Sequence, residues 1–186
     1  GAASAVATKY MARRDSTVLG IVGAGVQAKA QFEALSRVLG LRLVKVFSRT
    51  REHAEDFAKL IRSRGFDAVV ASDYEDVCRG VDVLVTATNS KDPFIRGSHL
   101  SPGMHINAIG SNWANRAELT PDAVLRADVI AVDDVSQARG RPSDDSITIF
   151  KSLGIAVEDL VLAKLIYDRA VRERKGVEIE FRGVHR

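Results

Sequence analysis

Along the chain, short runs of consecutive apolar residues alternate with segments in which apolar residues recur every three or four positions. Continuous apolar runs are typical of strands buried on both faces of a parallel sheet, whereas the helical spacing indicates helices with one buried face. The predicted strands cover residues 18–22, 43–47, 67–71, 81–86, 105–109, 128–132 and 147–150. The predicted helices cover residues 2–14, 27–39, 51–64, 72–77, 120–126 and 157–172.

This regular alternation sets the expected fold class and the domain boundaries. It favours an α/β fold of the Rossmann type, which is a doubly wound parallel sheet, with flanking N- and C-terminal helices. We expect residues 15–136 to form this domain. The polar stretch 137–145 is interpreted as a linker, and the segments 1–14 and 146–174 are expected to be mainly helical and to lie outside the domain.

Composition and charge narrow the class of protein. Of the 186 residues, 46% are hydrophobic and 27% are charged, which is typical of a globular domain. No stretch approaches the roughly 18 apolar residues of a membrane span, and the first residues lack the pattern of a signal peptide, so no membrane partner is expected. The net charge of +3 mildly favours an anionic ligand but is too small to indicate nucleic acid.

The cysteine and histidine content indicates neither a disulfide nor a metal site. Cys78 is the one cysteine and has no partner, so a reducing, cytoplasmic setting is expected. The helical pattern around Cys78 indicates a packed, small apolar side chain. The four histidines lack the spacing of metal ligands, and we expect no metal.

A glycine-rich turn, Gly23-Ala24-Gly25-Val26-Gln27-Ala28, joins the first predicted strand to the next helix. It matches G-x-G-x-x-A, a form of the dinucleotide-binding fingerprint. Gly23 permits the tight turn, Gly25 lets the backbone approach a pyrophosphate, and Ala28 lets the helix lie close to the strand. Because free N–H groups and the positive end of the helix dipole face this turn, it predicts a bound dinucleotide; the alternative is a purely structural turn.

The end of the second predicted strand discriminates between the two nicotinamide dinucleotides. Sites for NAD usually carry an acidic residue there, which accepts hydrogen bonds from the ribose hydroxyls. This chain has Ser48-Arg49-Thr50 instead. Ser48 and Thr50 can hydrogen-bond a phosphate and Arg49 can pair with it, so NADP(H) is favoured over NAD(H). The alternative is that Arg49 is a solvated charge near the start of a helix.

Several sequence blocks are informative when they are taken together with the glycine-rich turn. They are Gly1-Ala2-Ala3-Ser4-Ala5, Phe47-Ser48-Arg49-Thr50, Thr86-Ala87-Thr88, Ile106-Asn107-Ala108-Ile109-Gly110, Arg116-Ala117-Glu118-Leu119, Phe150-Lys151-Ser152-Leu153-Gly154 and Ala156-Val157-Glu158-Asp159. With these blocks the chain resembles the ornithine cyclodeaminase/mu-crystallin family over nearly its whole length. The last block, extended to residues 164–168, is most similar to mu-crystallin-like ketimine reductases.

The resemblance implies a homodimer of two-domain subunits that transfers a hydride between a nicotinamide and the α-carbon of an amino acid or cyclic imine. It identifies residues 1–14 and 146–174 as remnants of the second domain, which forms the dimer contact and most of the substrate pocket. Ser152 is assigned to the cofactor, with an N-cap or turn role as an equal alternative, and Leu153 to the substrate. The other cofactor contacts that the resemblance implies are Gly23, Gly25, Val26, Gln27, Ser48, Arg49, Thr50, Thr86, Thr88, Asn107, Ala108 and Ile109.

Two departures from the family pattern limit this interpretation. Where the cyclodeaminases carry an aspartate that exchanges a proton with the substrate nitrogen, this chain has Asn112. A carboxamide cannot exchange a proton near neutral pH, although it can orient an amine or imine; a turn role is the alternative. In addition, the chain begins where family members are already well into their sequence, and residues 138–146 look shortened, so a fragment is expected.

Three functions therefore stay open at this point. The favoured one is an NAD(P)H-dependent oxidoreductase that reduces imines or oxidises amino acids, with Asn112 in the catalytic position. Ornithine cyclodeaminase, which converts ornithine to proline and ammonia, is weakened by Asn112. A catalytically silent dinucleotide-binding module is the third, because most of the substrate domain is missing.

Overall fold

A computed structural model of the chain describes residues 1–111, 115–133, 141–152, 154 and 156–177. It divides into two compact units, Gly1–Leu153 and Gly154–Arg186. The helices are α1 (Ala2–Met11), α2 (Val26–Leu35), α3 (Arg51–Ser63), α4 (Tyr74–Cys78), α5 (Pro121–Leu125) and α6 (Ala156–Glu173), with a 3₁₀ helix, η1, at Gly97–His99. The strands are β1 (Val18–Val22), β2 (Leu43–Phe47), β3 (Ala68–Val70), β4 (Val83–Thr86), β5 (His105–Ala108), β6 (Val129–Val132) and β7 (Thr148–Lys151).

The first unit is built on a seven-stranded sheet in the order β3-β2-β1-β4-β5-β7-β6. Every pairing is parallel, and the register brings the carboxyl ends of the central strands to one edge, where Val22 pairs with Phe47 and Thr86, and Thr86 with Ala108. The chain runs outward from β1 in both directions, so the strand order reverses between β1 and β4. In open α/β sheets, ligands bind outside the carboxyl ends of the strands at such a topological switch point.

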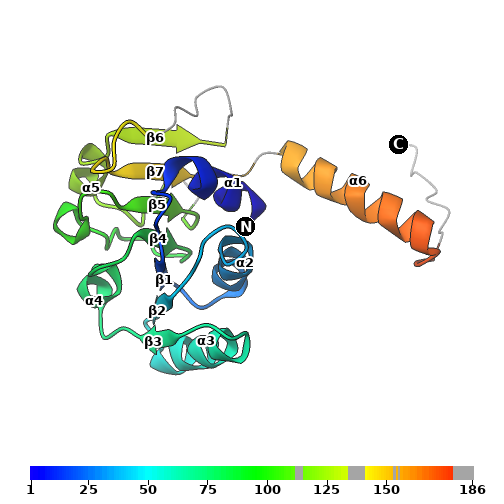
Figure 1. Cartoon of the computed structure of the whole chain (residues 1–186), viewed down its shortest axis with the longest axis horizontal. Coiled ribbons are helices and arrows are strands. Elements are labelled where there is room, and N and C mark those ends of the chain that lie inside the picture. Colours follow the sequence, from blue (N-terminus) through cyan, green and yellow to red (C-terminus); the bar gives the residue numbers. More distant parts are fainter. Residues whose placement is uncertain (112–114, 134–140, 153, 155, 178–186) are drawn as a thin grey trace. The chain divides into compact units, whose positions relative to one another are not determined.

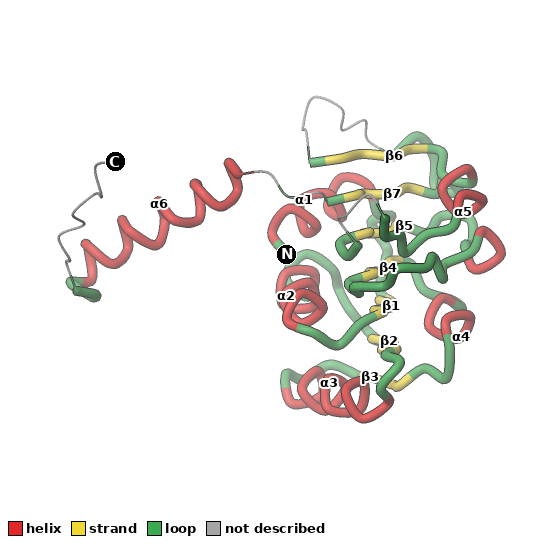
Figure 2. Tube along the Cα trace, turned by 180° about the vertical axis from the view of Figure 1, so that it is seen from behind, coloured by secondary structure: helices red, strands yellow, loops and turns green. Residues whose placement is uncertain are grey.

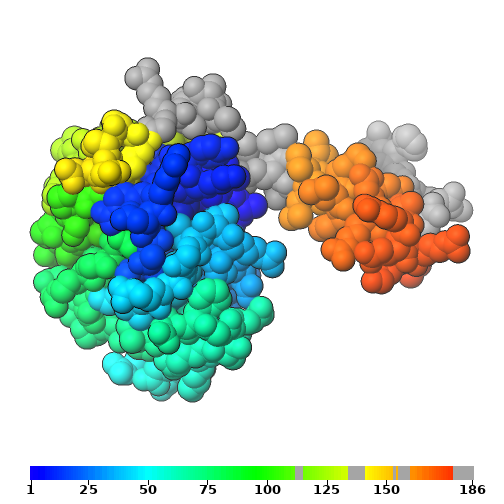
Figure 3. All heavy atoms as spheres, viewed as in Figure 1, coloured from blue at the N-terminus to red at the C-terminus, as the bar shows by residue number. Residues whose placement is uncertain are grey.

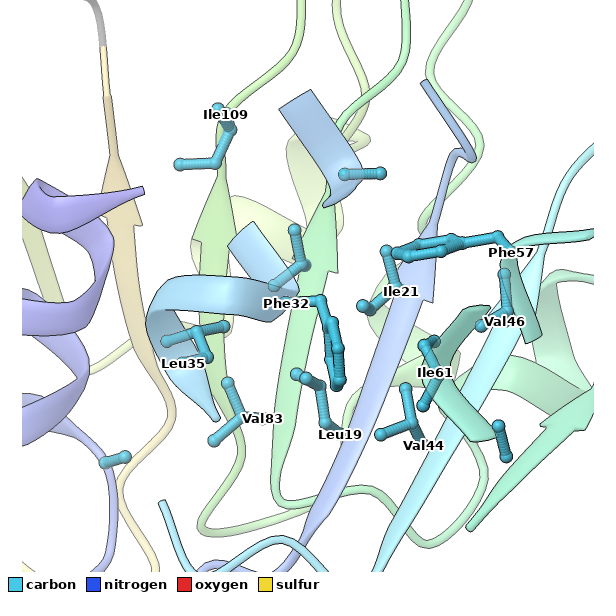
Figure 4. Packing of buried hydrophobic residues seen from close by; sticks show 14 of the residues in the cluster. Leu19, Ile21, Phe32, Leu35, Val44, Val46, Phe57, Ile61, Val83 and Ile109 are labelled. Carbon is cyan, nitrogen blue, oxygen red and sulfur yellow. The ribbon is translucent and has the colours of Figure 1, made fainter. Parts of the chain in front are cut away.

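Helices cover both faces of the sheet (Figure 1, Figure 2). Helices α1, α2 and α3 lie on one face, and α1 packs beside α2 (Figure 3). Helices α4 and α5 lie on the other face. Each face has its own apolar core, and Figure 4 shows the first, with Phe32 and Phe57 edge to face and their ring centroids 6.2 Å apart. Full burial of each such side chain stabilises the fold by about 1.5–3 kcal/mol.

The predicted α/β fold is confirmed, and each predicted strand and helix is present. Strands β1 and β2 have the predicted bounds, and the ends of the other elements are shifted. Helix α2 begins at Val26 and ends at Leu35, before the predicted residue 39, because the backbone then continues in i→i−3 hydrogen bonds from Arg37 to Ala34 and from Val38 to Leu35. Helix α1 ends at Met11 rather than at residue 14. The 3₁₀ helix η1 was not predicted.

Parts of the segments assigned to a second domain lie in or against the Rossmann sheet in the structure. Strand β7 pairs with β5 on one side and β6 on the other. Helix α1 is tied to the sheet by two buried hydrogen bonds, from Asn107 Nδ2 to Thr8 Oγ1 at 2.9 Å and from Thr148 Oγ1 to the Met11 carbonyl at 2.9 Å. Of the predicted linker 137–145, residues 137–140 lie outside the described part. The role of these segments in a second domain stays a prediction.

The second unit contains one described helix, α6. Ion pairs between positions i and i+4 stabilise its surface, from Lys164 to Asp168 at 2.7 Å and from Arg169 to Glu173 at 2.8 Å. From residue 160 onward, where its side chains are described, the large apolar ones are exposed: Leu160, Val161, Leu162, Leu165, Ile166, Tyr167 and Val171.

Candidate functional site

The glycine turn lies at the carboxyl end of β1 and is packed directly on the end of β4. Gly23 donates its N–H to the Phe47 carbonyl at 2.8 Å and has φ +115°. A Cβ at Gly23 would lie 2.5 Å from the carbonyl oxygen of Ala87. Both the backbone angle and the close approach therefore require glycine there.

Gly25 is different, because the protein itself does not require a glycine there. As the N-cap of α2 it has φ −80°, which any residue can adopt, and a Cβ would meet no protein atom within 4 Å. Gly25 lines a cleft, and Val26 beside it is 83% exposed. Since the first N–H groups of a helix have no intrahelical acceptor, they face this open space. Ala28, one turn further, is fully buried against the sheet, as predicted.

The cleft follows the carboxyl edge of the sheet across the switch point and has a volume of about 860 Å³. Several of the residues predicted to contact a cofactor line it: Gly23, Gly25, Val26, Gln27, Ser48, Arg49, Thr50 and Thr88. Its other lining residues include Lys29, His53, Asp56, Tyr74, Phe94 and Gly110.

At one end of the cleft, the loop after β2 presents polar and cationic side chains. Arg49 and Thr50 are exposed, and Thr50 is the N-cap residue of α3 without a side-chain capping bond, so its hydroxyl is not used by the helix. Lys29 on α2 and His53 on α3 line the same cleft. Neither was predicted as a site residue; their spacing from the glycine turn and from Thr50, within the first turns of two helices, was the available signal.

Three aromatic rings also line the cleft and were not singled out from the sequence. The rings of Phe47 and Tyr74 have centroids 4.6 Å apart with an interplanar angle of 64°. Tyr74 stacks on Phe94 at 4.6 Å and 20°. Because the three come from the end of β2, the start of α4 and the loop after β4, only the fold brings them together. Together they form an apolar, aromatic wall of the cleft.

A buried carboxylate holds the turns after β4 and β5, a role that was not predicted from the sequence. Glu118 is 3% exposed and accepts hydrogen bonds from Thr86 Oγ1 at 2.7 Å, from the N–H and hydroxyl of Thr88 at 2.7 Å each, and from the Gly110 N–H at 2.9 Å. Glu118 thereby stabilises the side of the cleft formed by Thr88 and Gly110.

The other described residues that were predicted to contact the cofactor do not line this cleft. The Thr86 side chain is fully buried against Glu118, and that of Asn107 is fully buried against α1, so neither side chain lines the cleft. Ala108 and Ile109 are buried as well, and Gly110 reaches the cleft in their place. Ser152 continues the β5 pairing through its N–H to Ala108, and its hydroxyl lies 3.5 Å from Asp133 Oδ2. Asn112 and Leu153 lie outside the described residues.

Two groups away from the cleft have strongly shifted pKa values. Burial lowers the pKa of His105 to about 3, and its Nδ1 lies 2.8 Å from Thr148 Oγ1. Because the Thr148 hydroxyl donates its proton to Met11, His105 Nδ1 must be the donor to Thr148, which fixes the neutral tautomer. Burial raises the pKa of Cys78 to about 12, and Cys78 is 1% exposed, as expected for a packed apolar side chain.

Among the described residues, no three His, Cys, Asp or Glu side chains gather closely enough to hold a metal ion. Across the same residues, no helix has the length and apolar character needed to cross a membrane.

Comparison with known proteins agrees with the fold. The chain is 34% identical to the alanine dehydrogenase of Archaeoglobus fulgidus over 97% of its length and 65% of the relative. It is 36% identical to the ketimine reductase mu-crystallin of Mus musculus over 90% of its length and 60% of the relative. The structure of Thermococcus litoralis Delta(1)-pyrroline-2-carboxylate reductase in complex with NADH and L-proline matches with a TM-score of 0.90 and 28% identity, covering 95% of this chain and 65% of that one.

The chain thus spans less than two thirds of the length of these relatives. The model of the ornithine cyclodeaminase/mu-crystallin family matches residues 1–139 and 136–174. These two matches meet at the start of the stretch that was expected to be shortened. The chain therefore belongs to the ornithine cyclodeaminase/mu-crystallin family.

Proposed function

We propose that this chain is the nicotinamide-dinucleotide-binding part of an oxidoreductase that acts at the α-carbon of an amino acid or a cyclic imine. The observation that carries the proposal is Gly25, where the fold leaves room for a side chain and the sequence has none. A pyrophosphate at the N-terminus of α2 would need that room, and the free N–H groups of the first turn would bind it. The dinucleotide, when bound, supplies or accepts the hydride.

Different residues of this chain would bind the two halves of such a ligand. The aromatic wall of Phe47, Tyr74 and Phe94 offers apolar surface for a planar base. The turn at Thr88 and Gly110 lies beyond the switch point, where the second mononucleotide half of a dinucleotide binds in this fold. The solved relative from Thermococcus litoralis, whose title names NADH and L-proline, supports a nicotinamide dinucleotide as the ligand.

We further propose that NADP(H) is preferred over NAD(H). Ser48-Arg49-Thr50 offers no carboxylate to a ribose, and Arg49, Lys29 and His53 place cationic or polar nitrogen atoms along the same cleft. A 2′-phosphate would gain charge-assisted hydrogen bonds there. Asp56 also lines the cleft, but Lys59 pairs with it at 3.0 Å, which offsets its charge.

The whole protein's reaction is proposed from its relatives. Curated relatives are named as alanine dehydrogenase, Delta(1)-pyrroline-2-carboxylate reductase and ketimine reductase, which together indicate small amino-acid or imine substrates. Asn112 argues against a cyclodeaminase, because a carboxamide cannot exchange the proton. A dinucleotide-binding module without turnover is the second candidate, because Asn112 stands where an acid–base residue would be needed and cannot exchange a proton. A homodimer and a cytoplasmic location stay predictions.

Fluorescence titration of the full chain with NADPH and with NADH tests the proposal. We expect both to bind, NADPH more tightly. Arg49→Gln should weaken NADPH binding by about tenfold to a hundredfold, the value of a charge-assisted hydrogen bond, and leave NADH unchanged. Arg51→Gln is the matched control, since Arg51 is exposed, pairs with Glu55 at 2.9 Å and does not line the cleft. Binding of neither dinucleotide would refute the proposed function, and tighter NADH binding would refute the preference alone.

A further inference from the structure

The backbone turn after β5 is held from both sides by two charged side chains. On one side, the Glu118 carboxylate accepts the Gly110 N–H at 2.9 Å. On the other side, Lys151 Nζ, at the end of β7, donates to the Gly110 carbonyl at 2.7 Å. Glu118 is buried and Lys151 is half-buried. Burial lowers the pKa of Lys151, while the charges of Glu118 and Asp133 oppose that shift.

This turn is packed directly on the neighbouring turn after β4. A Cβ at Gly110 would lie 2.2 Å from the Thr88 carbonyl oxygen and 2.5 Å from Glu118 Oε1. The next residue, Ser111, has φ +55°, which is unusual for a residue other than glycine, and its hydroxyl donates to the Ser90 carbonyl at 2.8 Å. Backbone held in such a conformation persists only where the surroundings fix it, and such positions cluster at ligand sites.

The position of this contact within the cleft indicates its role. Thr88 and Gly110 line the cleft on the β4–β5 side of the switch point, and Arg49 and the β2 loop line it on the other side. In this fold the two nucleotide halves of a dinucleotide bind on opposite sides of the switch point. The turns fixed by Glu118 and Lys151 would therefore face the nicotinamide half and leave the adenosine half untouched.

We propose that Glu118 and Lys151 are positioning residues for the nicotinamide half of the dinucleotide, acting through the backbone of Thr88 and Gly110. This inference rests on the proposed function. Neither side chain lines the cleft, so neither is expected to touch the ligand. Their role is to keep two turns at the spacing that the nicotinamide ribose and ring require.

The hydrogen bonds of Glu118 make Glu118→Gln a specific perturbation. Its Oε1 accepts from the Thr88 N–H and hydroxyl, and its Oε2 accepts from Thr86 Oγ1 and the Gly110 N–H. A glutamine side chain keeps only one acceptor oxygen, and its NH₂ group takes the place of the other. Hydroxyl groups can rotate to accept from its NH₂, but a backbone N–H cannot, so either Thr88 or Gly110 must lose its bond. One of the two turns then shifts.

The experiment compares NADPH with adenosine 2′,5′-bisphosphate, which keeps the adenosine half and lacks both the nicotinamide and its ribose, by calorimetry on the full chain. Glu118→Gln should weaken the binding of NADPH at least tenfold and the binding of the adenosine ligand less than twofold. Lys151→Met should also weaken the binding of NADPH more than that of the adenosine ligand, by about threefold or more. Lys45→Met is the matched control, because Lys45 is also half-buried and donates to backbone carbonyls, at Asp76 and Arg79, but does not line the cleft. Its ratio of the two affinities should equal that of the wild type.

The outcomes separate the two claims. If the wild type binds neither ligand, the proposed function fails, and this inference fails with it. If the wild type binds both and the two variants keep its ratio of affinities, the positioning role alone is refuted. Lys151→Met carries the test if Glu118→Gln does not fold, and thermal melting of each variant shows whether it is folded. A merely structural role would weaken the two ligands equally.

Discussion

Replacing Gly23 with alanine tests how tightly the glycine turn is packed on the end of β4. The new Cβ would lie 2.5 Å from the Ala87 carbonyl oxygen, at a residue with φ +115°. The turn cannot simply move away, because the Gly23 N–H donates to Phe47 at 2.8 Å on the neighbouring strand. Strained backbone at a residue other than glycine costs about 1–3 kcal/mol, and overpacking costs about 1–3 kcal/mol more.

Gly23→Ala should therefore lower the free energy of unfolding by about 2–6 kcal/mol. For a chain of this size, that corresponds to a fall in Tm of roughly 4–24 °C. Urea unfolding followed by circular dichroism measures the free energy, and Gly40→Ala is the matched control, because a Cβ at Gly40 meets no atom within 4 Å. A loss below about 1 kcal/mol, the average effect of a point mutation, would refute the reasoning by showing that the turn relaxes away from Ala87.

Two further predictions concern the buried groups away from the cleft. His105 has a pKa of about 3 in the folded protein and 6.5 as its unperturbed value, so the unfolded chain binds a proton that the folded one excludes. The free energy of unfolding should consequently fall as the pH is lowered from about 6.5 towards 3, by up to about 1.4 kcal/mol per pH unit from this group. When the free energy is measured by urea unfolding at several pH values, its dependence on pH should be weaker in His105→Gln than in the wild type. An unchanged pH dependence would contradict the assignment. Cys78, with its pKa raised to about 12 and 1% exposure, should resist a thiol reagent at pH 8 and react only in denaturant, whereas rapid labelling of the native chain would show that it is accessible.

The fold could be predicted from the sequence because its signals are local. The apolar run at Val18–Val22 indicates a buried strand whatever it pairs with, and it is buried throughout. The glycine turn carries its signal in consecutive residues, so the sequence alone was enough to predict the tight turn at Gly23, whereas the role of Gly25 towards a pyrophosphate stays a prediction. The limits of α2 were less predictable, because the competing i→i−3 hydrogen bonds after Leu35 have no strong sequence signal.

The rest of the candidate site depends on contacts between distant segments. Glu118 lies 32 residues from Thr86 and 8 from Gly110, and nothing in its own neighbourhood indicates that its carboxylate is buried between two turns. The aromatic wall likewise joins Phe47, Tyr74 and Phe94 from three separate segments. Asn107 shows the opposite case, since the family resemblance assigned it to the cofactor, but β5 directs its side chain to α1. Such placements follow from sheet order and register, which a single sequence does not specify.

The central claim, that the open space at Gly25 is filled by a dinucleotide pyrophosphate, is tested most directly by the affinity of Gly25→Ala for NADPH. Because an alanine there meets no protein atom within 4 Å and φ is −80°, the Tm of Gly25→Ala should match that of the wild type. NADPH binding should weaken by at least about tenfold, or about 1.4 kcal/mol, while Gly40→Ala keeps the wild-type affinity. Unchanged NADPH affinity in a folded Gly25→Ala would contradict the account.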